Sequence, residues 1–128
     1  MDRLLLVALG GAIGASLRFA AVGWAGRALG SAFPWGTLLV NVGGSFAMGV
    51  AAVLVAERLP ESWARLAPFL MTGVLGGFTT FSAFSLDVFG LMERGRAGLA
   101  AVYVLGSVAL SLAGLWAGVV LARAVSAP

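Results

Sequence analysis

Four long apolar runs, joined by short connections, constrain this chain more than any other feature of its sequence. Each run is close to the roughly 20 residues that a helix needs to cross the hydrocarbon core of a bilayer. The runs cover residues 4–26, 36–56, 68–92 and 97–122. Tryptophans lie toward the ends of the runs, where indole rings favour the headgroup layer. The sequence therefore predicts an all-α integral membrane protein in which residues 1–128 form one domain of four transmembrane helices.

Composition excludes several classes of function. Hydrophobic residues make up 61% of the 128 residues and charged residues only 10%, against roughly 25% charged in a typical soluble domain. The chain has no cysteine and no histidine, which excludes disulfides, thiolate metal sites and cysteine or imidazole catalysis. The net charge of +3 is not gathered into a basic block, so nucleic acid is not expected as a partner. We expect a membrane protein that is not an enzyme.

The first apolar run allows a second interpretation. Met1-Asp2-Arg3 precedes an apolar stretch that is followed by small residues, as in a secretory signal peptide. Arg18 and the second apolar half of the run make a poor signal sequence, so a transmembrane helix is the preferred interpretation.

The third run contains an unusual stretch between Thr72 and Asp87. Gly76-Gly77 lowers the helix propensity there, and Thr79 and Thr80 follow at once with hydroxyls that can bond freed backbone groups. We therefore expect the third helix to be broken. Because non-helical backbone at membrane depth survives only inside protein or beside a water-filled cavity, the break predicts a binding site or a pore.

Arginines are distributed almost evenly between the two ends of the predicted bundle. With four spans, one end collects Arg3, Arg58, Arg65 and Arg123, and the other collects Arg27, Arg94 and Arg96. Four against three is no bias under the positive-inside rule. The sequence therefore allows insertion in both orientations and predicts an antiparallel, dual-topology homodimer, the arrangement that transporters build from inverted repeats. Pairing with an oppositely oriented paralogue remains an alternative.

Polar residues recur at four-residue spacing on two of the predicted helices. The second run carries Thr37, Asn41 and Ser45, and the fourth carries Tyr103, Ser107 and Ser111. Such residues often serve only as hydrogen-bonding contacts between helices, and a lone serine can bond back to its own helix. The alternative is a polar pathway, in which the amide of Asn41 donates a hydrogen bond to a passing anion.

The first run places Gly10, Gly14 and Arg18 on one face. This face either packs closely against another helix while the arginine reaches the interface, or it forms a vestibule that attracts anions.

Phenylalanines in the third run are spaced three apart, at positions 78, 81 and 84. Aromatic spacing of this kind usually indicates core packing. Here Phe81 and Phe84 flank the hydroxyls of Thr80 and Ser82, and electropositive ring edges facing a narrow path could coordinate an anion. Asp87, one turn beyond Phe84, is either an interfacial carboxylate or a residue that controls a pore mouth.

Three segments taken together resemble the Fluc (CrcB) family of bacterial fluoride channels. They are GVLGGFTTFSAF at residues 73–84, GTLLVNVGG at 36–44 and GAIGASLRF at 11–19. The resemblance covers all four helices in order, and the first of these motifs is specific. It implies an antiparallel homodimer with two pores in the bacterial inner membrane, which exports fluoride passively and protects against fluoride toxicity.

The resemblance also implies roles for particular residues. The fluoride pathway is expected to contain Asn41, Thr80, Phe81, Ser82, Phe84, Tyr103, Ser107 and Ser111. The backbone carbonyls of Gly76 and Thr79, two from each subunit, are expected to hold a structural sodium ion at the centre of the dimer, and Arg18 corresponds to a vestibule arginine. Relatives commonly have a hydroxyl residue where this chain has Ala83, which removes one polar group from the expected pathway.

Two other functions remain open. A small dual-topology exporter of cationic drugs has a similar size and helix count, but it should need an acidic residue in the membrane interior, where this chain has Arg18. A membrane subunit without transport activity would use the polar stripes only as contacts between helices.

Overall fold

Helices make up almost all of the described part of this computed structural model, residues 2–126, and that part contains no strand. The elements are α1 (Arg3–Leu29), α2 (Trp35–Val53), η1 (Leu54–Arg58), α3 (Glu61–Ala64), η2 (Pro68–Leu75), α4 (Gly76–Phe78), α5 (Phe81–Glu93) and α6 (Ala97–Val125). The segments η1 and η2 have wider, π-type turns and continue the helices that they adjoin. Four helical stretches within residues 2–126 are long and apolar enough to span a membrane, which confirms the predicted class of fold.

The helices extend a few residues beyond the apolar runs. Helix α1 continues to Leu29 and α6 to Val125, so Arg27 and Arg123 lie in last turns, where a cation interacts favourably with the helix dipole. Capping residues determine where α1 begins and ends. Asp2 caps α1 by accepting a hydrogen bond from the Leu4 amide at 3.3 Å, and Gly30 ends the helix with a φ of 84°, a value that glycine adopts without strain.

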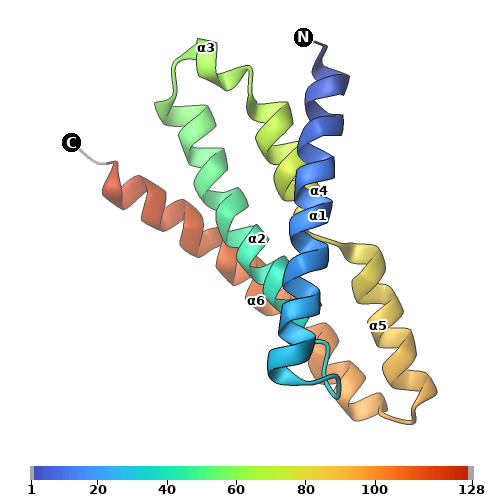
Figure 1. Ribbon diagram of the computed structural model, residues 1–128. Coiled ribbons are helices and arrows are strands. Elements are labelled where there is room, and N and C mark those ends of the chain that lie inside the picture. The colour runs from blue at the N-terminus through green and yellow to red at the C-terminus, as the bar shows by residue number, and fades with distance from the viewer. Residues whose placement is uncertain (1, 127–128) are drawn as a thin grey trace.

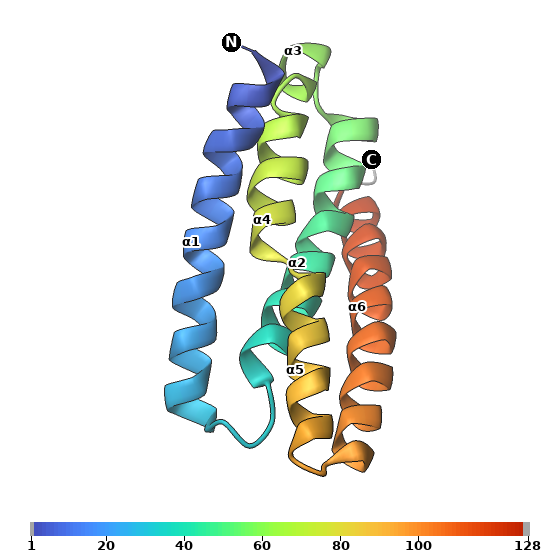
Figure 2. The same ribbon diagram turned by 90° about the vertical axis from the view of Figure 1, so that its right-hand side faces the viewer.

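The chain crosses the bundle four times and alternates direction. The start of α1, α3 and the end of α6 lie at one end of the molecule, and the loops that follow α1 and α5 lie at the other (Figure 1). Helices α2 and α6 therefore run in the same direction and pack along each other, while α1 packs against η2 and α4. Figure 2 shows α5 continuing below α4, offset from it at the interruption.

Glycines allow the paired helices to touch through their backbones. A Cβ atom on Gly14 of α1 would collide with the Val74 carbonyl, and one on Gly49 of α2 would collide with the Leu115 carbonyl of α6. In a bilayer the hydrophobic effect does not drive helices together, because lipid tails are as apolar as the side chains. Helices therefore associate through close van der Waals packing of this kind. The glycine pattern thus sets which helices are neighbours and at what level they meet.

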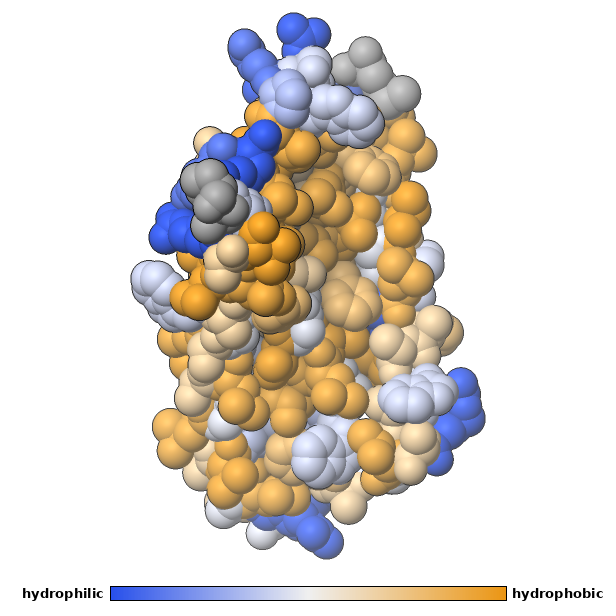
Figure 3. Space-filling view, turned by 90° about the vertical axis from the view of Figure 1, so that its left-hand side faces the viewer, coloured by the Kyte–Doolittle hydropathy of each residue, from blue (hydrophilic) through white to orange (hydrophobic). Residues whose placement is uncertain are grey.

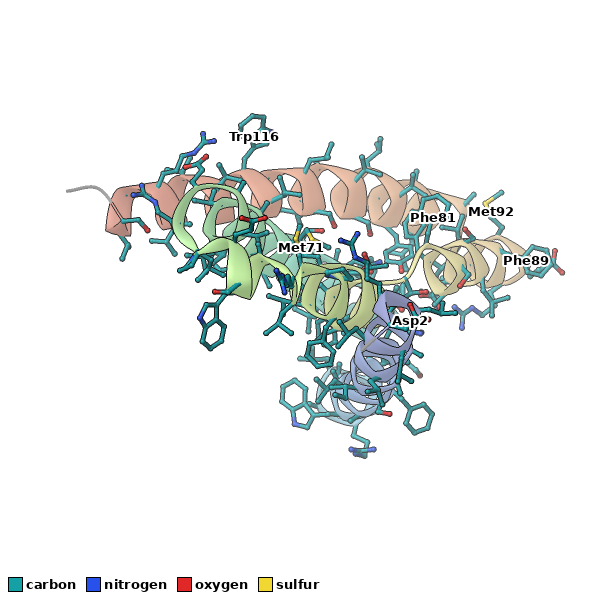
Figure 4. The ribbon with its side chains drawn as sticks, turned by 90° about the horizontal axis from the view of Figure 1, so that it is seen from above. Asp2, Met71, Phe81, Phe89, Met92 and Trp116 are labelled. Atoms are coloured by element: carbon teal, nitrogen blue, oxygen red, sulfur yellow. The ribbon has the colours of Figure 1, made fainter. Side chains whose placement is uncertain are left out.

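The outer surface is apolar between two hydrophilic ends. Figure 3 shows hydrophobic residues over the middle of one face, with hydrophilic residues gathered toward its two ends. Large apolar side chains project outward, and Trp116, 64% exposed, points away from the bundle (Figure 4). A soluble protein would not expose contiguous apolar surface on this scale, so lipid or a second protein covers it.

Candidate functional site

The third span is interrupted at two threonines. Helix α4 ends at Phe78, Thr79 and Thr80 have extended backbone with ψ angles of 158° and 122°, and α5 begins at Phe81. Thr80 caps α5 because its hydroxyl oxygen accepts a hydrogen bond from the Ala83 amide at 3.1 Å. Thr79 instead closes the end of the preceding helix, since its amide and its hydroxyl both donate to the Leu75 carbonyl. The Thr79 hydroxyl therefore caps the helix before the break, and the Thr80 hydroxyl caps the helix after it.

The side chain of Asn41 holds the extended peptide in place. Its Nδ2 donates to the Thr80 carbonyl at 2.9 Å, and its Oδ1 accepts from the Thr80 amide at 2.7 Å. Backbone groups that leave a helix inside a membrane need such partners, because water is not present to satisfy them. Asn41 thus fixes the Thr80 backbone to α2 through this pair of hydrogen bonds, called the strap below. One of its two amide hydrogens remains for another acceptor.

Arg18 is bound at the same level from the other side. The guanidinium Nε donates to the Gly77 carbonyl at 3.0 Å, one residue before α4 ends. Carbonyls at a helix C-terminus lack intrahelical partners and carry partial negative charge, so a cation there is stabilised. The partner is a neutral carbonyl, which leaves the positive charge of Arg18 uncancelled in the middle of α1.

A central groove runs along the bundle beside the break. It encloses about 300 Å³ and is open along one side. Its lining residues are Asn41, Gly44, Ser45, Met48, Thr79, Thr80, Phe81, Phe84, Ser107, Val108, Ser111 and Leu115. The structure therefore brings together Asn41, Thr80, both phenylalanines and the two α6 serines that the sequence singled out. None of the lining side chains is charged.

Serines outside and inside the central groove differ in their hydrogen bonds. Ser16 and Ser85, both exposed, donate to the carbonyls four residues before them in their own helices. Ser107 is only 5% exposed, and its Oγ has no partner among the described residues. A buried hydroxyl without a partner costs free energy unless water or a ligand satisfies it. Ser107 therefore presents to the groove a hydroxyl that water or a ligand can bind.

Phe81 and Phe84 occupy very different environments. Their ring centroids are 5.4 Å apart with a tilt of 50°, yet Phe84 is 9% exposed and Phe81 is 77% exposed. Figure 4 places Phe81 at the end of α5 nearest the interruption, beside α6. The two rings thus lie along one edge of the central groove, and Phe81 extends beyond the single chain.

Tyr103 separates the central groove from a second cavity of about 230 Å³. Its fully buried ring packs on Phe84 at a centroid distance of 5.2 Å, and its hydroxyl donates to Oδ2 of Asp87 at 2.9 Å. Asp87 lines the second cavity together with Thr37 and Arg94. The carboxylate therefore fixes the orientation of the tyrosine hydroxyl at the junction of the two cavities.

Four of the residues predicted from sequence do not line the central groove, and Tyr103, described above, is one of them. Ser82 is exposed, and its hydroxyl lies 3.4 Å from that of Thr80. Arg18 lies behind the break on α1, and Gly76 lies in α4. Sequence reasoning noted the four-residue spacing of Ser45 but did not place it in the pathway, and it missed the bonds of Arg18 to Gly77 and of Asp87 to Tyr103. No local pattern marks these last two contacts, because they join residues far apart in the chain.

Two carbonyls at the break are free to bind a cation. Within the described residues, the carbonyl oxygens of Gly76 and Thr79 accept no hydrogen bond, and Gly76 is exposed on the surface of the single chain. No cluster of acidic side chains that could hold a metal ion occurs in residues 2–126. Neutral oxygen dipoles are the ligands that a hard monovalent cation accepts, so the donor set fits sodium.

Comparison with known proteins identifies the family. Residues 5–119 match the family described as "CrcB-like protein, Camphor Resistance (CrcB)". The chain belongs to the CrcB-like family. Among curated relatives, "Fluoride-specific ion channel FluC" from Cereibacter sphaeroides (strain ATCC 17029 / ATH 2.4.9) is 61% identical over 123 residues, which cover 96% of each chain.

Other CrcB-like relatives are nearly as similar. Proteins with the same name from Chelativorans sp. (strain BNC1) and Rhizobium johnstonii are 56% and 52% identical, and the alignments cover 98% of this chain and 99% and 100% of theirs. The chain is a multi-pass membrane protein of this family.

Proposed function

We propose that the chain forms a fluoride-specific channel that releases fluoride passively across the bacterial inner membrane. The unpartnered hydroxyl of Ser107, buried in an uncharged groove at membrane depth, is the observation that carries this function. Relatives that match the whole chain are named fluoride-specific ion channels, and the groove offers what fluoride requires.

Fluoride requires several donors at once. Moving a carboxylate-sized ion from water into a medium of low dielectric constant costs of order 20 kcal/mol. One hydrogen bond in an apolar medium is worth about 4–6 kcal/mol. A dehydrated fluoride therefore needs about four donors at each resting position. Uncharged donors let the ion leave again, which conduction demands.

The open side of the central groove supports a second copy of the chain as partner. An ion cannot lie in a groove that opens to hydrocarbon, because the side facing lipid offers no replacement for its water. A copy inserted in the opposite orientation would close the groove and bring its own Phe81 to the ring pair. The Phe81 side chain, which is 77% exposed in the single chain, would then be covered by the partner copy. The even distribution of arginines supports the antiparallel arrangement.

We further propose that a sodium ion stabilises this dimer. The free carbonyls of Gly76 and Thr79 would hold it, with the same pair from the partner copy. Each oxygen is a neutral dipole, so four of them match a monovalent cation without burying a carboxylate.

The alternative of a cation exporter finds no support in the groove. Exchange of a cationic drug for protons needs an acidic residue in the transport path, and none of the residues that line the central groove is acidic. Asp87 faces the second cavity and accepts a hydrogen bond from Tyr103.

Efflux from liposomes tests the function directly. Purified protein is reconstituted into vesicles loaded with potassium fluoride, and a fluoride electrode follows release after a potassium ionophore is added. We expect rapid release of fluoride and none of chloride from matched vesicles. Phe81→Ile, which removes the ring edges, should slow the release. Release no faster than from protein-free vesicles would refute the proposal, and equal release of chloride would refute its selectivity.

A further inference from the structure

We propose that Ser45 is a further fluoride-binding residue, which pairs with Ser111 to form a second resting position one turn away from Asn41 and Ser107. This inference rests on the proposed function. It assigns to α2 a donor beyond Asn41, on the side of the interruption away from Phe84.

The register between α2 and α6 places Ser45 and Ser111 at the same level. The two helices run in the same direction, and Gly49 packs against the Leu115 carbonyl. Gly49 and Leu115 each lie four residues beyond Ser45 and Ser111. The same offset joins Glu57 to Arg123, whose Nη2 lies 2.8 Å from Oε1 of the carboxylate.

Asn41 and Ser107 form the preceding level with the same offset. One turn of four residues advances about 6 Å along each helix. The central groove is lined by all four of these side chains, so it contains two successive polar levels rather than one.

The hydroxyl of Ser45 is available to a ligand. Ser16 and Ser85, both exposed and outside the groove, donate to their own helices at 2.7 and 2.9 Å, whereas no such bond is made by Ser45 or Ser111 in the described part of the chain. Ser45 is half-buried and lines the same groove as the buried, unpartnered Oγ of Ser107. The serines that face the groove thus keep their donors free.

The free donors of α2 and α6 are divided between the two levels. Thr79 donates its hydroxyl hydrogen to Leu75, and the Thr80 hydroxyl already accepts from the Ala83 amide and lies beside Ser82. The free donors that α2 and α6 present to the groove are one hydrogen on Asn41 and the hydroxyls of the three groove serines, Ser45, Ser107 and Ser111. Each of the two levels therefore offers two free donors from one chain, and Ser45 supplies one of the two at its own level.

Substitutions at Ser45 with matched controls test the assignment. Ser45→Ala removes the donor and should slow fluoride efflux about tenfold, the factor expected for one hydrogen bond to an ion. Ser45→Thr keeps a hydroxyl and should restore release. Ser16→Ala removes a hydroxyl that bonds its own helix and should leave the rate unchanged. If the unmodified chain releases fluoride and Ser45→Ala matches it, the proposed function stands and the assignment of Ser45 is overturned.

Cysteine labelling gives a readout that needs no ion flux. The chain contains no cysteine, so Ser45→Cys and the control Ser85→Cys, at a position outside the groove, each carry a single thiol. Methyl methanethiosulfonate reacts with thiolates, which form only where water reaches the sulfur. We expect intact-mass analysis to show much faster modification of Ser45→Cys than of Ser85→Cys in membranes. Equal rates would overturn the placement of Ser45 in a hydrated path, even if the unmodified chain released no fluoride.

Discussion

The strap between Asn41 and Thr80 makes a prediction whose size follows from its geometry. Asn41→Ala removes the acceptor of the Thr80 amide at 2.7 Å and the donor to the Thr80 carbonyl at 2.9 Å. Each partly buried backbone group left without a partner costs about 1–3 kcal/mol. Asn41→Ala leaves two such groups, and both are only partly buried, so the lower part of the range applies. The extended conformation of Thr80 should therefore be destabilised by about 2–3 kcal/mol.

Hydrogen exchange at the Thr80 amide measures this loss. A change of about 2–3 kcal/mol corresponds to roughly 30- to 150-fold faster exchange. Asn41→Asp provides a matched variant, because its carboxylate still accepts from the Thr80 amide but faces the Thr80 carbonyl with an oxygen instead of a donor. The amide should then stay protected, although the strap is weaker. Ser85→Ala, which removes a hydroxyl bonded to its own helix, should leave exchange unchanged.

One result would refute the role of the strap. If the Thr80 amide in Asn41→Ala exchanged within twofold of the unmodified chain, Asn41 would not be what holds the extended peptide. A continuous helix could also protect this amide, since the Thr80 amide would then bond the Gly76 carbonyl. The Cα chemical shift of Thr80 separates the two cases, because helical and extended backbone shift it in opposite directions.

Three further predictions concern the rest of the site. Gly14→Ala should destabilise the chain by about 1–3 kcal/mol, because a Cβ atom there meets the Val74 carbonyl, while Gly43→Ala, with open space around it, should be neutral in a detergent denaturation series. Tyr103→Phe removes the hydroxyl that donates to Asp87, so fluoride efflux should fall while the thermal midpoint shifts by only a few degrees; unchanged efflux would exclude this hydroxyl from the path. Arg18→Gln can still donate to the Gly77 carbonyl but loses the charge, so efflux should fall and depend less on ionic strength than in the unmodified chain.

The spans were predictable because hydropathy alone sets them. Residues 97–122 form an uninterrupted apolar run, and α6 follows it closely. The third run was harder. Its weak helix propensity lies at Gly76-Gly77, yet α4 includes both glycines and the extended residues are Thr79 and Thr80. Tertiary contacts decide the position, because Asn41 binds the peptide of Thr80 and Gly77 lies against the backbone of α1, where a Cβ atom would collide with the Gly11 carbonyl.

The residues of the central groove were predictable as far as periodicity reaches. Ser107 and Ser111 share one face of α6 because they are four residues apart, and both line the groove. Periodicity does not show which partner a polar group finds. Asn41 was expected to donate to an anion, and the structure shows that half of its hydrogen-bonding capacity already holds the backbone.

Arg18 pairs with a carbonyl and not with a carboxylate, and this pairing affects the sign of the ions that the proposed channel admits. A guanidinium neutralised by an acidic partner would present little net field, but this one keeps its full charge because Gly77 contributes only a dipole. Two copies would place two such charges near the bilayer midplane. The low dielectric constant there lets their electric field act over many ångströms. In the proposed channel, the hydroxyls would select among halides by size and hydration, while the two guanidiniums would favour anions over cations before either ion reaches the groove.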